Sequence, residues 1–304
     1  AALARGSTLQ ALQARGWQLV DRSGASLAAG PAKASDRAAD LGLQDLVVIA
    51  VKGPALGAVA AAVAEMTGPD TVVLPAMNGV PWWFCSRVGG DVPAVLQSVD
   101  PGGRIAGQIA DASVLGCVVH ISALVCAPGV VQHQNGNRLI VGEPGGGHSA
   151  RSERIVSALR DSGLEVDHSS DVRRDIWFKL WGNLTMNPIS ALTGATVDRI
   201  LGDPLVRAFC SAAMAEASQV GARIGCPIEQ SPEERHAVTA RLGAFKTSML
   251  QDVEAGRAIE LDAIVGAVQE IARGLGMATP SIDALLGLTR LMARTRGLYP
   301  PEAP

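Results

Sequence analysis

The sequence predicts an α/β fold with a mostly parallel sheet in its first half and an all-helical domain in its second half. Short β-branched runs alternate with helical patterns up to about residue 170, as expected where helices cover a parallel sheet. Beyond Asp171 the strand signals disappear, and helical periodicity continues to Arg296. A chain of 304 residues can form two domains, and we expect them at residues 1–170 and 171–304.

The elements expected in the first domain alternate between strand and helix. They are strands at residues 45–51 and 71–74, helices at 55–66 and 150–161, and a short strand at 164–166. The uncharged run from 114 to 131, followed by Asn135-Gly136 and residues 138–141, predicts a hairpin that turns at Asn135-Gly136. In the second domain, one helix carries a core stripe of Leu261, Ile264, Val265, Val268, Ile271 and Leu275.

Composition excludes several classes of function. A net charge of -3 gives no general attraction to nucleic acid or to an anionic membrane. The uncharged run at 112–137 is long enough for a membrane span, but its polar residues favour buried strands. The five cysteines form no CxxC pair and the five histidines no HExxH motif, so we expect neither a disulfide framework nor a metal site. A reducing cytoplasmic location fits best, and no secretory signal is expected.

One helix carries an unusual row of polar residues. Lys179, Asn183 and Asn187 follow one another at four-residue spacing, which stacks them along one edge of a helix. Leu180 and Leu184 repeat one position away, so the row borders a face that is expected to be buried. Such groups need partners, and we interpret the row as the floor of an active site. The alternative is a solvated lysine with amides bonded to nearby backbone.

Pro188 directly follows this row. Proline disfavours a helical conformation at Asn187 and cannot donate to the preceding turn. We therefore expect the helix to kink or break at this position.

Four segments together resemble the ketopantoate reductases (2-dehydropantoate 2-reductases). The helix at 179–188 looks like the one that opens that family's second domain. Val51-Lys52 resembles its strand-ending lysine, and residues 76–80 (AMNGV) resemble its asparagine-glycine turn. Residues 248–252 (SMLQD) with 260–262 (ELD) resemble its late signatures. The order and spacing agree over nearly the whole chain, which implies a Rossmann-like first domain and a helical substrate-binding second domain.

One family feature is missing from this sequence. The family begins with a strand and a GxGxxG turn that holds the dinucleotide pyrophosphate, and the chain contains no such motif. Leu3-Ala4-Arg5-Gly6 resembles the end of the family's second strand. The expectation is therefore that about 20 to 30 residues of strand, turn and helix have been omitted.

The resemblance implies NADPH-dependent reduction of a 2-oxo acid to a 2-hydroxy acid, with ketopantoate or a related branched acid as substrate. Lys179 would be the general acid that protonates the carbonyl oxygen. Two alternatives stay open. One is a 3-hydroxy acid dehydrogenase of the 6-phosphogluconate dehydrogenase-like group, and the other is a catalytically idle NADPH-binding metabolite sensor.

The resemblance also implies roles for other residues of the second domain. Asn183 and Asn187 would hydrogen-bond the substrate, and Ser248 would bind its carboxylate. Glu260 would contact Lys179 or the cofactor ribose, although a carboxylate at a helix start is often only a partner of the free amides. Phe245 stands where the best-known members have an asparagine, which weakens the transfer of ketopantoate as substrate.

On the cofactor side the resemblance implies three residues of the first domain. Asn78 would orient the nicotinamide or its ribose, and Lys52 would meet ribose or phosphate charge. Arg5 would clamp the 2'-phosphate of NADPH. The aromatic cluster Trp82-Trp83-Phe84 is expected to pack in the core or in a possible homodimer, and it is also a candidate wall of the substrate pocket.

Overall fold

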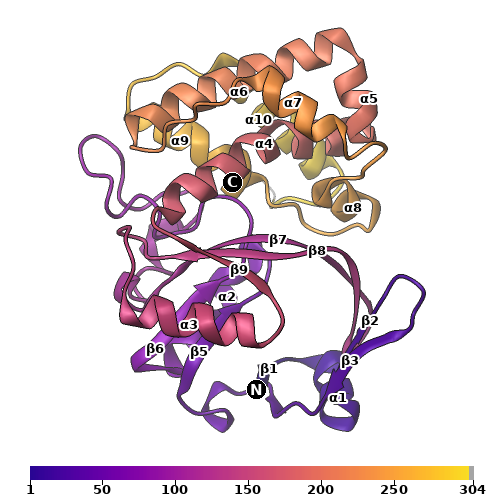
Figure 1. The fold of residues 1–304 in the computed structure, drawn as a ribbon. Coiled ribbons are helices and arrows are strands. Elements are labelled where there is room, and N and C mark those ends of the chain that lie inside the picture. The colour runs from indigo at the N-terminus through magenta and orange to yellow at the C-terminus, as the bar shows by residue number, and fades with distance from the viewer. Residues whose placement is uncertain (301–304) are drawn as a thin grey trace. The chain divides into compact units, whose positions relative to one another are not determined.

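The computed structural model describes residues 1–300, and their contacts divide into two compact units (Figure 1). The first, here called the sheet unit, contains residues 1–50, 57–76 and 107–172. The second, the helical unit, contains residues 51–56, 77–106 and those from 173 onward. The helical unit therefore includes two segments from the first half of the chain. The predicted division at residue 170 stays a prediction.

The sheet unit contains nine strands and three α-helices among the described residues. The strands are β1 (Ala2–Leu3), β2 (Trp17–Val20), β3 (Ser26–Gly30), β4 (Ala34–Ser35), β5 (Gln44–Ile49), β6 (Thr67–Pro75), β7 (Gly116–Ala127), β8 (Val130–Gly142) and β9 (Glu165–Ser169). The helices are α1 (Gly6–Arg15), α2 (Leu56–Glu65), which begins one residue before this unit, and α3 (Ala150–Asp161).

Parallel pairing dominates this unit, which confirms the predicted fold class. β5, α2 and β6 form a β-α-β unit with parallel strands, in which Leu46 pairs with Val72 and Ile49 with Pro75. β1 pairs in parallel with β4, and β8 pairs in parallel with both β2 and β9. The antiparallel pairs are β2 with β3 and β7 with β8. Buried residues from β6, β7, β8, β9 and α3 share one apolar core.

The predicted position of the hairpin turn is wrong. β7 and β8 turn at Pro128-Gly129, where Gly129 has φ 74°. A proline followed by a glycine at positive φ suits a type II turn. Asn135-Gly136 lies inside β8 instead, where Gly136 adopts φ 74° and a Cβ would clash with the carbonyl oxygen of His120. The left-handed conformation that this dipeptide favours therefore produces an irregularity in strand pairing, not a chain reversal.

Helix α3 begins where its sequence predicts. Ser149 is the N-cap, and its hydroxyl accepts a hydrogen bond from the Ser152 amide, while the Ser152 hydroxyl accepts one from the Ser149 amide. This reciprocal pair satisfies two donors that the first turn leaves free. Ile155 and Val156 on the same helix are buried in the core of the unit.

The helical unit is built from two long helices and several shorter ones. They are α4 (Val172–Thr193), α5 (Val197–Gly202), α6 (Pro204–Arg223), α7 (Pro232–Ala240), α8 (Ser248–Glu254), a π-helix (Asp262–Gly266) that continues into α9 (Ala267–Gly274), and α10 (Pro280–Thr295). Five members of the predicted core stripe, Leu261, Ile264, Val265, Val268 and Ile271, are confirmed at no more than 1% exposure, whereas the sixth, Leu275, follows the end of α9 and is only partly buried.

Of the kink or break expected at Pro188, a break does not occur, because α4 continues to Thr193, and a kink stays a prediction. The residues on either side of the proline, among them Leu184, Met186 and Ile189, are buried. A proline within a helix costs about 3 kcal/mol. Burial of several large side chains outweighs that cost, since each contributes about 1.5–3 kcal/mol.

The aromatic cluster lies in the core of the helical unit, where Trp82, Trp83 and Phe84 are each at most 2% exposed. Phe84 stacks on Trp177 of α4 with ring centroids 6.0 Å apart, and the guanidinium of Arg173 lies 4.9 Å from the Phe84 centroid. The segment 77–106 is therefore anchored to α4 by aromatic packing. Among the described residues, no helix is both long and apolar enough to cross a membrane.

Candidate active site

Two loops of the helical unit follow directly on strands of the sheet unit. Lys52 and Gly53 come shortly after the end of β5, and Asn78 and Gly79 come shortly after the end of β6. In parallel sheets, the residues that follow the carboxyl ends of strands are the usual ligand-binding positions. Each loop is held by side chains or backbone from the second half of the chain.

The Asn78 loop is held by Lys179. The ammonium nitrogen of Lys179, which is half-buried on α4, donates to Oδ1 of Asn78 at 2.7 Å. Hydrogen bonds to a charged group are stronger than neutral ones and fix its direction. Of the predicted site residues, Asn78 and Lys179 are thus brought into contact, and the lysine is not a freely solvated side chain.

A tight backbone contact sets the position of Asn78. Gly79 has φ 82°, and a Cβ at this residue would lie 2.5 Å from the carbonyl oxygen of Ala263. The next residue, Val80, donates its amide to that same oxygen at 2.8 Å. Only glycine fits both the left-handed conformation and the close approach.

The π turn after Glu260 explains why the carbonyl oxygen of Ala263 is available as an acceptor. The amide of Ala267 donates to the carbonyl of Asp262, five residues back, so it does not take up the carbonyl of Ala263. π turns occur mostly as single turns and frequently at functional sites. The extra residue in this turn therefore supplies the acceptor that positions the Asn78 loop.

Asp262 in the π turn is partly buried. Burial raises the pKa of the Asp262 carboxyl, and the hydroxyl of Tyr299 opposes this shift by donating to Oδ1. Burial, together with the bond to Asp262, raises the pKa of Tyr299. The two groups tie the end of the described chain to the helix that carries Ala263.

Asn183 and Asn187 follow Lys179 on the same face of α4, as predicted. Asn187 is 5% exposed and Asn183 is half-buried. Among the described residues, the side chain of neither one takes part in a hydrogen bond, although amides can donate and accept. Amides without hydrogen-bond partners among the described residues, on the same helix face as a fixed ammonium group, are suited to a polar ligand.

Lys52 is held by a carboxylate to which sequence reasoning gave no role. Asp252, at 3% side-chain exposure, accepts from the ammonium group of Lys52 through Oδ2 and from Nε of Arg257 through Oδ1, at 3.0 Å for the second contact. Asp252 is the last residue of the SMLQD segment, so the signal was present in the motif. Its partner lies 200 residues away, which a motif alone does not reveal.

Glu260 also holds the Lys52 loop. Its Oε1 accepts the amide of Gly53 at 3.1 Å. The residue immediately precedes the first helical residue, Leu261, in agreement with a position at a helix start. Glu260 thus lies beside the strand-end loop that carries Lys52.

Ser248 and Arg5 are both exposed. Ser248 is the first residue of α8, whose N-cap is Thr247, and Phe245 just before it is 39% exposed. Arg5 precedes α1 in the sheet unit, and its guanidinium makes no hydrogen bond to the described residues.

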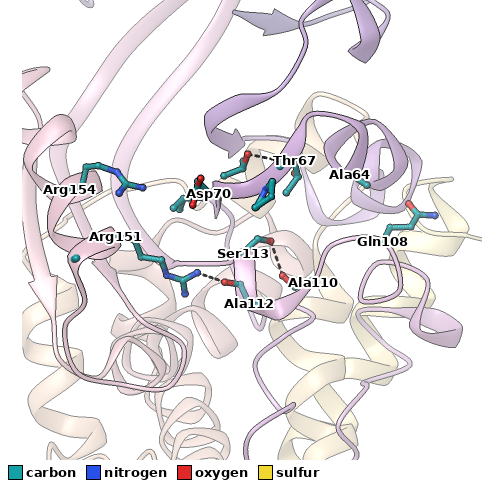
Figure 2. A pocket seen from close by; sticks show the side chains of 14 residues that line it. Ala64, Thr67, Asp70, Gln108, Ala110, Ala112, Ser113, Arg151 and Arg154 are labelled. Atoms are coloured by element: carbon teal, nitrogen blue, oxygen red, sulfur yellow. Dashed lines mark hydrogen bonds between the residues drawn. The ribbon is translucent and has the colours of Figure 1, made fainter.

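A cavity of about 570 Å³ lies in the sheet unit and contains none of the predicted site residues (Figure 2). It surrounds the first residues of β6 and the start of α3, whereas Asn78 follows the other end of β6. Arg151 at its wall donates to the carbonyl of Ala112 and pairs with Glu143, and this carboxylate raises the pKa of Arg151. No cluster of three or more potential metal ligands occurs among the described residues.

Comparison with known proteins gives several similar sequences and structures. A 2-dehydropantoate 2-reductase of Mesorhizobium japonicum is 42% identical over 298 residues, which cover 98% of this chain and 91% of that protein. A crystal structure of a candidate ketopantoate reductase from Ralstonia solanacearum MolK2 is 57% identical, with a TM-score of 0.93 over 98% of this chain and 91% of that one. A D-mandelate dehydrogenase solved with NADH and anilino(oxo)acetate has a TM-score of 0.79 over 96% of this chain and 89% of that one, and at 19% identity it shows the fold alone.

A parallel β-α-β sheet followed by a helical domain is the architecture of the oxidoreductases that have a Rossmann-type sheet and a helical C-terminal domain. The family model "Ketopantoate reductase PanE/ApbA" matches residues 1–146, and "Ketopantoate reductase PanE/ApbA C terminal" matches residues 171–293. The chain belongs to the ketopantoate reductase family, whose members reduce 2-oxo acids.

Proposed function

We propose that this chain reduces a branched 2-oxo acid, with ketopantoate as the first candidate, to the 2-hydroxy acid at the expense of NADPH. The observation that carries the proposal is the Lys179–Asn78 hydrogen bond on the helix face that also carries the half-buried Asn183 and the buried Asn187. Reduction of a carbonyl group places negative charge on its oxygen. An ammonium group held in one direction stabilises that charge and can deliver the proton.

In this proposal, each predicted site residue on the helices of the helical unit has its own role. Lys179 donates the proton to the carbonyl oxygen, and Asn78 keeps its ammonium group oriented. Asn183 and Asn187 donate to and accept from the substrate, because their amides have no other hydrogen-bond partners among the described residues. Ser248 binds the substrate carboxylate through an exposed hydroxyl.

The residues that would hold the cofactor are Lys52, Asn78 and Arg5, with Glu260 toward the ribose. Lys52 is 42% exposed at the end of a parallel strand, and the guanidinium of Arg5 is exposed, which suits both for contact with phosphate charge. When bound, the cofactor supplies the hydride. A nicotinamide is supported by the D-mandelate dehydrogenase of the same fold, which was solved with NADH. The preference for NADPH rests on Arg5.

Purified protein should oxidise NADPH in the presence of ketopantoate, with weaker activity on smaller or bulkier 2-oxo acids. Replacing NADPH with NADH should raise the KM for the cofactor more than it lowers kcat. Arg5→Ala should reduce this preference for NADPH. Absence of turnover with every 2-oxo acid of a branched and aryl panel, together with tight NADPH binding, would support a metabolite sensor. Turnover of 3-hydroxy acids alone would support the 6-phosphogluconate dehydrogenase-like alternative. Family membership favours neither alternative.

Two further parts of the proposal concern the setting of the enzyme. We place it in the cytoplasm, because none of its five cysteines forms a disulfide and four of them are buried. We also propose a homodimer. Fractionation of the source cells and measurement of the molar mass in solution test these two points.

A further inference from the structure

Arg235 of α7 lies against the side of α4 that carries Lys179. Its guanidinium carbon is 4.9 Å from the ring centroid of Phe178. A Cβ at Gly182 would lie 2.9 Å from Nη2 and 3.0 Å from Nε of the same guanidinium, which therefore approaches α4 where a glycine leaves room. Gly182 is four residues after Phe178 and three after Lys179, and residues at these spacings are neighbours on a helix surface.

The guanidinium of Arg235 has no partner for its charge among the described residues. Its Nε is buried and makes no hydrogen bond, and no carboxylate or carbonyl accepts from its terminal nitrogens. Burial lowers the pKa of Arg235, and no neighbouring carboxylate opposes that shift. A partly buried cation without an anion is unfavourable, and an anionic ligand would remove this cost.

Arg173 shows the same aromatic contact in a purely structural setting. Its guanidinium carbon also lies 4.9 Å from a ring centroid, that of Phe84, but its Nη2 donates to the carbonyl of Ile224 at 3.1 Å. Arg235 rests on its ring equally closely and lacks such an acceptor. Because only Nε of Arg235 is buried, its terminal nitrogens remain accessible to an acceptor that is not part of the chain.

The proposed substrate supplies an anion at a suitable distance from Lys179. A 2-oxo acid carries its charge on a carboxylate attached directly to the carbonyl carbon, and in the proposed reaction Lys179 is engaged at the carbonyl oxygen. The amides of α4 and the hydroxyl of Ser248 are neutral, so they do not balance the carboxylate charge. Three residues along a helix span about 4.5 Å, so Arg235 contacts α4 within about one turn of Lys179. The two terminal nitrogens of a guanidinium match the two oxygens of a carboxylate.

We infer that the terminal nitrogens of Arg235 bind the carboxylate of the 2-oxo acid together with Ser248, and that Phe178 is the surface on which the guanidinium rests. Arg235 therefore selects free acids over their uncharged esters. The inference rests on the proposed function, because it assigns the charge of that substrate to a residue beside Lys179.

The first test compares 2-oxoisovalerate with its methyl ester, which keeps the carbonyl group and lacks the charge. The unmodified protein should prefer the acid in kcat/KM. Arg235→Met keeps an unbranched side chain over Phe178 and should raise the KM for the acid at least about tenfold, with a smaller effect on kcat and little effect on the ester. Arg235→Lys should recover part of the loss, because it keeps the charge without the planar pair of donors.

Arg241→Met is the matched control for the loss of charge. Arg241 is an exposed arginine at the end of the same helix, so this change should leave the kinetics of both the acid and the ester as they are.

A second variant displaces the guanidinium without removing it. In Gly182→Ala the new Cβ takes the space of Nη2 and Nε, so the guanidinium must shift. Alanine is the better helix former, so resistance to urea should be equal or greater, yet the KM for the acid should rise. Gly202→Ala, where a Cβ meets open space, should leave this KM unchanged. If Arg235 served packing alone, KM would change only where stability falls.

Failure of this inference can be told apart from failure of the proposed reaction. Turnover with an unchanged ratio of acid to ester in Arg235→Met would overturn the role of Arg235 and leave the reaction intact. If the unmodified protein turns over no 2-oxo acid, calorimetric titration with 2-oxoisovalerate and its ester in the presence of NADP⁺ measures the carboxylate contact directly. Weaker binding of the acid alone to Arg235→Met would support the contact. Equal affinities of the two proteins, or no binding of the acid, would overturn it.

Discussion

The amide oxygen of Asn78 lies 2.7 Å from the ammonium nitrogen of Lys179, although 101 residues separate them in the chain. Asn78 lies in the loop that follows β6, and Lys179 lies on α4. This one hydrogen bond therefore fixes both the position of the loop and the direction of the lysine side chain. Both residues were expected at the site, but not as partners.

Lys179→Ala should lower kcat by about 10²- to 10⁴-fold, the usual contribution of a positioned general acid. Cofactor affinity, measured by NADPH fluorescence, should change little. Lys246→Ala is the matched control, because Lys246 is an exposed lysine of the same unit paired with Glu254. Normal turnover in Lys179→Ala would remove this residue from the mechanism.

Asn78→Ala should lower kcat by about tenfold or more, since a hydrogen bond to a charged group is worth about 1.5–3 kcal/mol. Its effect should vanish in the Lys179→Ala background, because the amide then has no ammonium group to orient. Steady-state kinetics of the two single variants and the double variant measure this coupling. Fully additive losses would show that Asn78 acts without Lys179.

Asp252→Asn should destabilise the protein by about 1–2 kcal/mol and raise the KM for NADPH, because Lys52 and Arg257 lose their shared charge. Breaking a fully buried pair costs about 3–5 kcal/mol, but both cations here are around half exposed and are screened by water. Urea unfolding gives the stability. Glu254→Gln removes an exposed pair with Lys246 and should change stability by less than about 0.5 kcal/mol. Equal effects of the two changes would contradict a special role for Asp252.

Gly79→Ala should destabilise the helical unit by about 2 kcal/mol or more and reduce turnover, because it combines a left-handed backbone with a clash against Ala263. Gly256→Ala is the matched control, since Gly256 has φ 64° but open space around a Cβ. It should show only the backbone cost of about 1 kcal/mol. A similar loss of stability in both variants would show that the clash with Ala263 adds nothing to the cost of the left-handed backbone.

Asp262→Asn should flatten the dependence of stability on pH in the acid range. Burial raises the pKa of Asp262 above its ordinary value of 3.8, so the folded state binds the proton more tightly than the unfolded state does. The stability that protonation supplies is fully present below pH 3.8 and is lost as pH rises through the folded-state pKa. Thermal unfolding of both proteins across this interval measures the difference. If the curves of unfolding temperature against pH were parallel for the two proteins, Asp262 would not be the group that determines the pH dependence.

Local sequence signals predicted the elements but not every turn. Helix α3 was predicted with its observed bounds, because helical patterning is a signal that acts over a few residues. The hairpin was misplaced because two turn signals, Pro128-Gly129 and Asn135-Gly136, compete within one run. Tertiary pairing decides between such signals. Pro188 was overridden in the same way by the burial of its neighbours.

The candidate site could be predicted as a set of residues but not as a set of contacts. The polar row on α4 followed from helical spacing, and the loop residues followed from the resemblance. Asp252 went unassigned because its partner, Lys52, lies 200 residues away. The acceptor role of Ala263 was also invisible, since it depends on a π turn and not on a side chain.

The assignment of residues 51–56 and 77–106 to the helical unit has a practical consequence for dissecting this protein. The chain passes between the two units at five points along its length, so no single cut yields both of them whole. A fragment that starts at residue 173 would lack Lys52, Asn78 and the aromatic anchor of Trp82 and Trp83. We therefore expect such a fragment to be recovered aggregated or partly unfolded, and a functional split protein to require that both pieces be produced together.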